Sequence, residues 1–153
     1  MSLWDSSLAT GNPGFDQVHE ATLGRMEEVL EAIADEDATR TEQLLGELAA
    51  EVSRHFDEEE AEAGAGYLTK EHREGHRLFV AELERLRDAF SRRGLGPALP
   101  LWMKSRIVNW FRFHIATHDI PLARALGRAG PAGAPSPPTA AASATPPAAS
   151  PGA

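Results

Sequence analysis

The stretch "FHIATHD", residues 113–119, places two histidines and an aspartate within one short segment that also carries apolar residues. Histidine and carboxylate side chains this close together suggest a metal site. The polar end of a helix would show the same residue types. The two interpretations differ in what they require elsewhere, because a metal site needs further donors from other parts of the chain.

Four segments of the chain carry apolar residues in alternating steps of three and four, which is typical of amphipathic helices. They run from Leu23 to Ile33, from Leu45 to Val52, from Phe79 to Phe90 and from Met103 to Trp110. "TRTE" at 39–42 is a possible capping box before the second segment. Gly94 is the expected stop of the third, and Pro121 is expected to limit the fourth. We therefore predict an all-α protein, an up-down-up-down antiparallel four-helix bundle.

Each of these four apolar stripes becomes histidine or carboxylate when it is extended along the helix. The extended positions are His19 in the first segment, His55 and Glu59 in the second, His72 and His76 in the third, and His114 in the fourth. One buried histidine is usually a satisfied core residue, and i, i+4 pairs are common by chance because they share a helix face. In an antiparallel bundle, however, all four places fall at the same end. Buried imidazoles and carboxylates without partners each cost on the order of several kcal/mol, which a metal cluster would remove. A purely hydrogen-bonded polar layer is the alternative.

Four motifs resemble those of the hemerythrin family, particularly the bacterial hemerythrins. They are "FDQVH" at 15–19, "HFDEE" at 55–59, "HREGH" at 72–76 and "HIATHD" at 114–119. The resemblance covers residues 4–126 and implies two iron ions in a non-haem di-iron centre that binds dioxygen. Carried over motif by motif, it implies the iron ligands His19, His55, Glu59, His72, His76, His114 and Asp119.

The resemblance also implies how these ligands are shared. The histidines at 72, 76 and 114 would serve one iron, and those at 19 and 55 the other. The two carboxylates and an oxo or hydroxo group would bridge the two ions. The iron with three histidines would then be six-coordinate and closed, whereas the iron with two would keep an open position for a small ligand.

The choice of Asp119 runs against simple helix geometry. Asp119 lies five residues after His114, about 140° round an ideal helix, whereas His118 would share the face of His114. Pro121 disfavours helical geometry at Ile120, so the helix is free to loosen there. Two metals also need bridging anions, and imidazole cannot bridge as a carboxylate does. We therefore expect Asp119 to be a ligand and His118 to lie outside the ligand set.

The balance of donors also bears on the chemistry. Ferritin-like oxidases use more carboxylates and a Glu-x-x-His pattern. Five neutral imidazoles supply less negative charge than a carboxylate-rich ligand set does. This favours reversible binding of dioxygen over its catalytic reduction. Glu58 and Glu60 flank the expected bridge Glu59, and we interpret both as a solvated acidic face.

Three aromatic residues lie next to the expected ligands, namely Phe56, Trp110 and Phe111. Similar positions in the family line the dioxygen pocket, and ordinary core packing is a compatible interpretation. Thr22 stands where the family usually has an apolar residue, one turn after the first histidine. This departure puts the polarity of the pocket in doubt.

Composition limits the remaining possibilities. The 153 residues include 23 acidic and 15 basic residues, for a formal net charge of -8, which argues against nucleic acid or an anionic membrane as the main partner. The absence of cysteine excludes thiolate ligands. We see no secretory signal and no apolar span, so we expect a cytoplasmic protein. Residues 1–128 should form the bundle, and residues 129–153, which are uncharged and rich in proline and alanine, should be disordered.

We therefore expect an oxygen-binding protein rather than an enzyme. Oxygen transport, storage and sensing are all compatible with this prediction, and the sequence indicates no particular protein partner. One alternative is a di-iron oxidoreductase acting on peroxide, nitric oxide or ferrous iron. The other is a structural helical bundle that binds a different metal, such as zinc.

Overall fold

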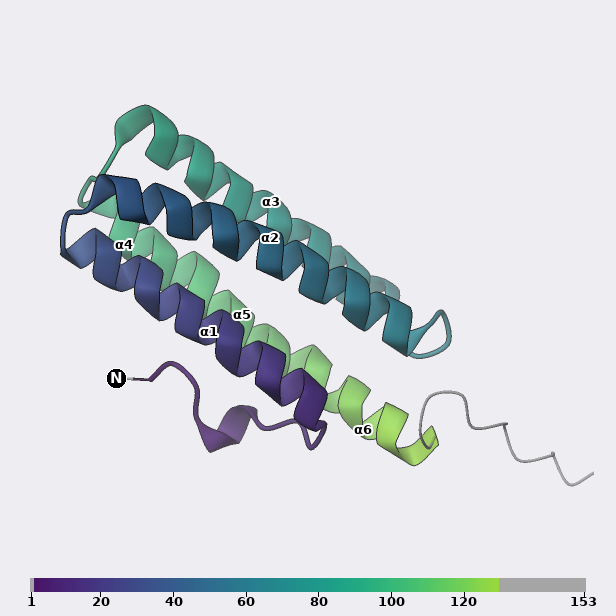
Figure 1. Ribbon diagram of the computed structural model, residues 1–153. Helices are drawn as coiled ribbons and strands as arrows, with labels where there is room; N and C mark the ends of the chain where they lie inside the picture. The colour runs from purple at the N-terminus through teal and green to yellow at the C-terminus, as the bar shows by residue number, and fades with distance from the viewer. Residues whose placement is uncertain (1, 130–153) are drawn as a thin grey trace, which may run out of the picture.

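The computed structural model describes residues 2–129, and within this range the chain forms an antiparallel four-helix bundle without a strand (Figure 1). The predicted fold class is confirmed. After a short 3-10 turn, η1 (Ser6–Leu8), the first three bundle helices are α1 (Pro13–Ala34), α2 (Ala38–Ala63) and α3 (Lys70–Arg93). Five consecutive segments build the fourth bundle helix: α4 (Ala98–Trp102), η2 (Met103–Val108), α5 (Asn109–His114), η3 (Ile115–Asp119) and α6 (Ile120–Ala129).

Side-chain caps fix where α1 and α3 begin. The Asn12 side chain accepts hydrogen bonds from the backbone N–H groups of Gly14 and Phe15, at 3.0 and 3.2 Å. The Thr69 hydroxyl accepts one from the backbone N–H of His72, at 3.1 Å. Gly94 ends α3 with a φ of 67°, a conformation that glycine adopts without strain, so this stop is confirmed.

The predicted capping box at 39–42 is wrong. Asp37 is the N-cap of α2, and its carboxylate accepts a hydrogen bond from the backbone N–H of Arg40 at 2.9 Å. Aspartate in an extended conformation caps a helix as well as threonine does, so α2 begins at Ala38, before the predicted box.

The prediction that Pro121 limits the fourth helix is also wrong, because the helix continues to Ala129. Just before the proline, η3 is a π-helical turn, in which the Ile120 N–H bonds to the carbonyl of Ile115 five residues back. The regular i to i-4 ladder is therefore already interrupted where proline lacks its N–H. The chain accommodates Pro121 at this wide turn and continues as α6.

Two apolar clusters enclose the buried polar residues. The larger fills most of the bundle and includes Leu48, Leu83 and Ile107, none of them exposed by more than 1%. The smaller lies where α6 passes the ends of α1 and α2, and consists of Phe15, Ala63, Leu68, Leu122 and Ala123. Along each bundle helix the buried histidines and carboxylates fall between members of these clusters. Apolar packing therefore seals the polar layer from both sides.

No helix in the described range is long and apolar enough to cross a membrane. The last helix ends at Ala129, next to the expected limit of the bundle at residue 128. The predicted disordered tail lies outside the described residues, apart from its first position.

Replacing a core leucine of α3 should destabilise the bundle. Leu86 is fully buried, so Leu86→Ala should lower the free energy of unfolding by about 2 to 5 kcal/mol through lost burial and a residual cavity. Leu78 on the same helix is 57% exposed, and Leu78→Ala should change the free energy of unfolding by less than about 0.5 kcal/mol. Denaturant melts of both variants check this, and equal effects would contradict the assigned core face.

Candidate metal centre

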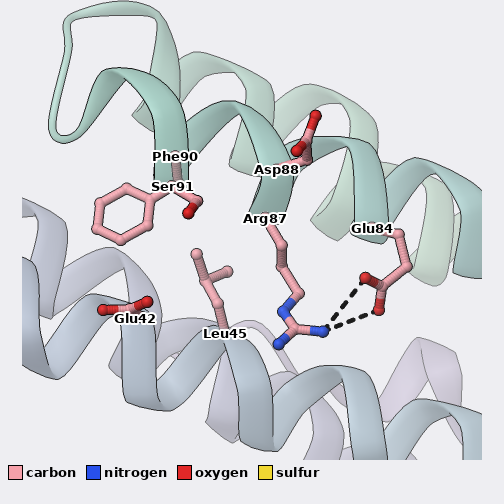
Figure 2. A pocket seen from close by; sticks show the side chains of 7 residues that line it. All are labelled: Glu42, Leu45, Glu84, Arg87, Asp88, Phe90 and Ser91. Atoms are coloured by element: carbon pink, nitrogen blue, oxygen red, sulfur yellow. Dashed lines mark hydrogen bonds and ion pairs between the residues drawn. The ribbon is translucent and has the colours of Figure 1, made fainter.

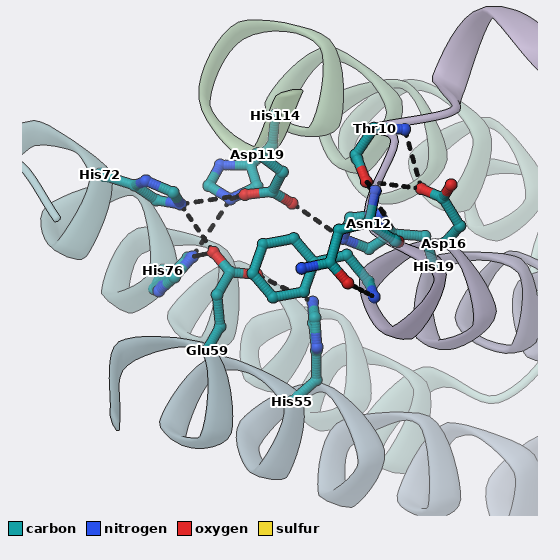
Figure 3. A network of polar contacts seen from close by, with 11 residues as sticks. Thr10, Asn12, Asp16, His19, His55, Glu59, His72, His76, His114 and Asp119 are labelled. Carbon is teal, nitrogen blue, oxygen red and sulfur yellow. Dashed lines mark hydrogen bonds and ion pairs between the residues drawn. The ribbon is translucent and has the colours of Figure 1, made fainter. Parts of the chain in front are cut away.

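Seven polar side chains from all four bundle helices meet in one layer, and none is more than 4% exposed (Figure 3). They are His19 from α1, His55 and Glu59 from α2, His72 and His76 from α3, and His114 and Asp119 from the fourth helix. The structure therefore brings together all seven residues that the sequence singled out as metal ligands.

The Glu59 carboxylate faces histidines on both sides of the layer. Its Oε1 lies 3.0 Å from Nε2 of His72 and 3.6 Å from Nε2 of His76. Its Oε2 lies 3.3 Å from Nε2 of His55. The two oxygens of this carboxylate therefore belong to different sets of imidazoles.

The Asp119 carboxylate divides its oxygens in the same way. Its Oδ1 lies 3.0 Å from Nε2 of His72 and 3.1 Å from Nε2 of His114, and its Oδ2 lies 2.9 Å from Nε2 of His19. The donors accordingly form two overlapping groups that share both carboxylates. One group is Glu59, His72, His76, His114 and Asp119, and the other is His19, His55, Glu59 and Asp119.

Separations near 3 Å suit ligands of a common metal ion. Metal–nitrogen and metal–oxygen distances in such sites are about 2.0 to 2.2 Å, and neighbouring ligands at right angles then lie about 3 Å apart. The imidazole Nε2 atoms of His76 and His114 are also only 3.1 Å apart. Two neutral imidazoles can share one proton at this distance, but they can equally direct two lone pairs at one cation.

The wide turn η3 explains how Asp119 joins His114. A π turn closes its hydrogen bonds over five residues instead of four, so residues five apart approach the same face. The His118 ring lies beside the layer, with its centroid 5.0 Å from that of His72 and 5.2 Å from that of His114. His118 belongs to neither donor group.

The buried donors are poorly satisfied by one another. Nine side-chain nitrogen and oxygen atoms of His19, His55, Glu59, His72, His114 and Asp119 are buried without a well-directed hydrogen bond within the described chain. An unsatisfied buried polar atom costs about 1 to 3 kcal/mol, whereas a whole domain is stable by only about 5 to 15 kcal/mol. Coordination of these atoms to cations would remove this cost. The residues therefore fit a metal site.

Both carboxylates are held in the ionised form. Burial raises the pKa of Asp119, but its contacts with His114, His19 and His72 outweigh burial and keep that pKa well below its usual range. Burial likewise opposes ionisation of Glu59, yet the contacts with His72 and His76 lower its pKa. Two buried negative charges thus lie at the middle of the layer, where they would attract a cation.

The pKa values of the imidazoles differ with their surroundings. Burial lowers the pKa of His55 to about 4, against the opposing effect of Glu59, and burial also lowers the pKa of His114. Burial acts in the same direction on His72, but Asp119 and Glu59 overcome it and raise the pKa of His72 to about 9. A cation that binds here therefore finds neutral rings at His55 and His114 and displaces a proton from His72.

The four expected pocket residues lie on different parts of this layer. Phe111 is fully buried, with its ring centroid 5.8 Å from that of His19 and 6.5 Å from that of His55. The other two aromatic residues stack on rings of the larger donor group, Phe56 on His76 at 3.9 Å and Trp110 on His114 at 4.7 Å. Thr22 is buried and, with His55, borders a surface hollow of about 290 Å³ between α1 and α2.

Sequence reasoning missed Glu60 and Phe15. The interpretation of Glu60 as a solvated carboxylate holds only in part, because 33% of its side chain is exposed but its Oε1 lies 3.1 Å from Nδ1 of His76. It follows Phe56 by one helical turn, and that spacing could have indicated a shared partner. Glu58, with 67% of its side chain exposed, fits the solvated interpretation.

Phe15 lies one turn before His19 on the same stripe, and their ring centroids are 6.3 Å apart.

A second hollow lies far from this layer, between the other ends of α2 and α3 (Figure 2). It has a volume of about 290 Å³, and its lining includes Leu45, Glu84 and Arg87. Leu45 precedes His55 by ten residues, or about 15 Å along the helix. Arg87 pairs with Glu84 of its own helix at 2.9 Å.

Comparison with known proteins finds a distant relative. The chain is 23% identical over 119 residues to a bacteriohemerythrin of Aquifex aeolicus (strain VF5), an alignment that covers 76% of this chain and 91% of that protein. No family model matches the chain, and no solved structure matches it. The similarity is weak, and it supports a hemerythrin-like protein at most.

Replacing Asp119 should cost the protein its metal, whereas replacing His118 should not. Asp119→Ala removes an oxygen from both donor groups, so we expect the metal content of the purified chain to fall by at least half. His118→Ala removes a neighbouring ring that belongs to neither group. Elemental analysis of both variants checks this. If the His118 variant lost metal and the Asp119 variant retained it, regular helix periodicity would be the better guide to the ligands.

Proposed function

We propose that this chain is a hemerythrin-like protein that holds two iron ions and binds dioxygen reversibly. The observation that carries the proposal is the sharing of Glu59 and Asp119 between a five-residue and a four-residue donor group. Carboxylates that place one oxygen in each group are suited to bridge two cations. Bridged pairs of metal ions in proteins lie about 3.5 to 4 Å apart.

The donor types support iron, although they do not demand it. Imidazole with carboxylate suits several first-row metals, including iron and zinc. The similarity to a bacteriohemerythrin favours iron among them. On this proposal His72, His76 and His114 serve one ion and His19 and His55 the other.

The unequal donor groups support binding of a small molecule. Two ferrous ions held by these residues would supply the electrons for reversible binding of dioxygen. The group with His19 and His55 contains one protein donor fewer, so a small ligand has room on that side. Phe111 packs against both of these rings and gives them an apolar neighbour.

The limited number of carboxylates supports reversible binding of dioxygen rather than its catalytic reduction. Within the two donor groups, five imidazoles accompany only two carboxylates. This set supplies little negative charge to stabilise more oxidised metal states. We therefore propose an oxygen-binding role and no enzymatic turnover. We also propose that the protein works in the cytoplasm and that residues 1–128 form its functional domain.

The purified chain should contain two irons and change colour reversibly with oxygen. Reduced protein should develop a visible absorption band in air and lose it when oxygen is removed, over repeated cycles. Elemental analysis and optical spectra check both statements. Sustained oxygen consumption in excess reductant, without a reversible band, would indicate an oxidoreductase. Zinc in place of iron would indicate a structural metal bundle.

Removing the Thr22 hydroxyl should prolong reversible binding. Thr22 is buried beside the hollow that reaches His55, and its hydroxyl offers water a partner near the four-residue group. Thr22→Val keeps the shape and should slow the loss of the oxygen-binding form severalfold. Thr41→Val is a control, since Thr41 is buried near the start of α2, fourteen residues before His55. Repeated oxygenation cycles measure the rate, and a faster loss in Thr22→Val would contradict the assigned role of pocket polarity.

A further inference from the structure

Helix α2 presents two adjacent stripes to the polar layer, and the proposed ligands use one of them. His55 and Glu59 form the stripe that enters the donor groups. Phe56 and Glu60, each one residue further along, form a second stripe with the same four-residue spacing. Both members of this second stripe contact one ring, the imidazole of His76 on α3.

The two contacts restrain the ring in different ways. The Phe56 ring lies parallel to the His76 ring, with an interplanar angle of 6° and a centroid distance of 3.9 Å. The Glu60 carboxylate approaches the ring edge, with Oε1 3.1 Å from Nδ1. Stacking limits tilting of the ring plane, and the edge contact limits rotation within it.

The edge contact also selects one tautomer. A carboxylate at this position accepts a hydrogen bond, so Nδ1 of His76 must donate it. The lone pair then lies on Nε2, which faces Glu59 Oε1 at 3.6 Å and His114 Nε2 at 3.1 Å. By contrast, the Nδ1 atoms of His19 and His114 are buried without a hydrogen-bond partner among the described residues.

Glu60 gains little stability from this arrangement. Its side chain is 33% exposed, and partly exposed pairs of this kind contribute little to stability. It also lies in the last turn of α2, where the helix dipole disfavours a negative charge.

We propose that Glu60 is a positioning residue for the metal centre, whose carboxylate accepts a hydrogen bond from His76 Nδ1 and holds Nε2 toward the five-residue group. The inference rests on the proposed function, since it assigns Nε2 of His76 to a metal ion. Carboxylate partners of this kind fix the orientation of a ligating histidine and increase its donor strength.

Iron retention tests this inference on the iron-loaded full-length chain. Glu60→Ala should lose iron to an excess of chelator about 10- to 100-fold faster than the unchanged chain. Glu60→Gln should be intermediate, because its amide oxygen accepts the same hydrogen bond without the charge. Measured without metal, the melting temperature should change by no more than a few degrees in both variants, which separates positioning from a structural role.

Glu58 provides the matched control, since it lies two residues earlier on α2 with 67% of its side chain exposed. Glu58→Ala and Glu58→Gln should retain iron as the unchanged chain does. Equal iron loss from Glu60→Ala and the unchanged chain would overturn the inference. So would equally fast loss from Glu58→Ala, because the effect would then come from the charge of the helix end.

A second measurement separates this inference from the proposed function. Imidazole nitrogen NMR of the ¹⁵N-histidine-labelled full-length chain, without added metal, reports the His76 tautomer. The proton should lie on Nδ1 in the unchanged chain and in Glu58→Ala, and this preference should be lost in Glu60→Ala. A preference that persists in Glu60→Ala overturns the role of Glu60. If the unchanged chain takes up no iron, the proposed function fails, and the NMR result still decides the role of Glu60.

Discussion

The structure depends on the burial of two carboxylates and five imidazoles in the middle of a helical bundle. Seven polar side chains with almost no exposed surface carry a large desolvation cost. Short contacts between carboxylate oxygens and imidazole nitrogens keep Glu59 and Asp119 ionised but leave many donor atoms without well-directed hydrogen bonds. Cations at the two places where these atoms converge would resolve the imbalance. The apolar clusters on either side bury the layer within the bundle.

The irregular fourth helix helps to build the same polar layer. A regular α-helix could present His114 together with His118, and the layer would then lack one of its two shared carboxylates. The π turn η3 brings Asp119 to the layer instead, and it lies directly before Pro121. The continuation of the helix as α6 also supplies Leu122 and Ala123, which close the layer on its outer side. One local change in helical geometry therefore both completes the donor set and seals it.

Most of this arrangement could be predicted from the sequence because it follows from periodicity. The apolar stripes predict four helices, and extending them identifies His19, His55, Glu59, His72, His76 and His114. Asp119 could not be found in this way, since the π turn changes the period, and it required the family resemblance and the need for bridging anions. Pro121 was misread as a helix end for the same reason. Glu60 was missed because it lies off the ligand stripe, and its partner His76 belongs to another helix. The start of α2 was misplaced because Asp37 and Thr39 are comparable caps.

Two metal ions bound between the two donor groups would share Glu59 and Asp119. A crystal structure of the iron-loaded chain, with anomalous diffraction measured at the iron absorption edge, tests this arrangement. Two anomalous peaks per chain are expected, about 3.5 to 4 Å apart. One should be surrounded by His72, His76 and His114 and the other by His19 and His55, with each carboxylate contacting both. A single peak, or a peak coordinated by His118 in place of Asp119, would contradict it.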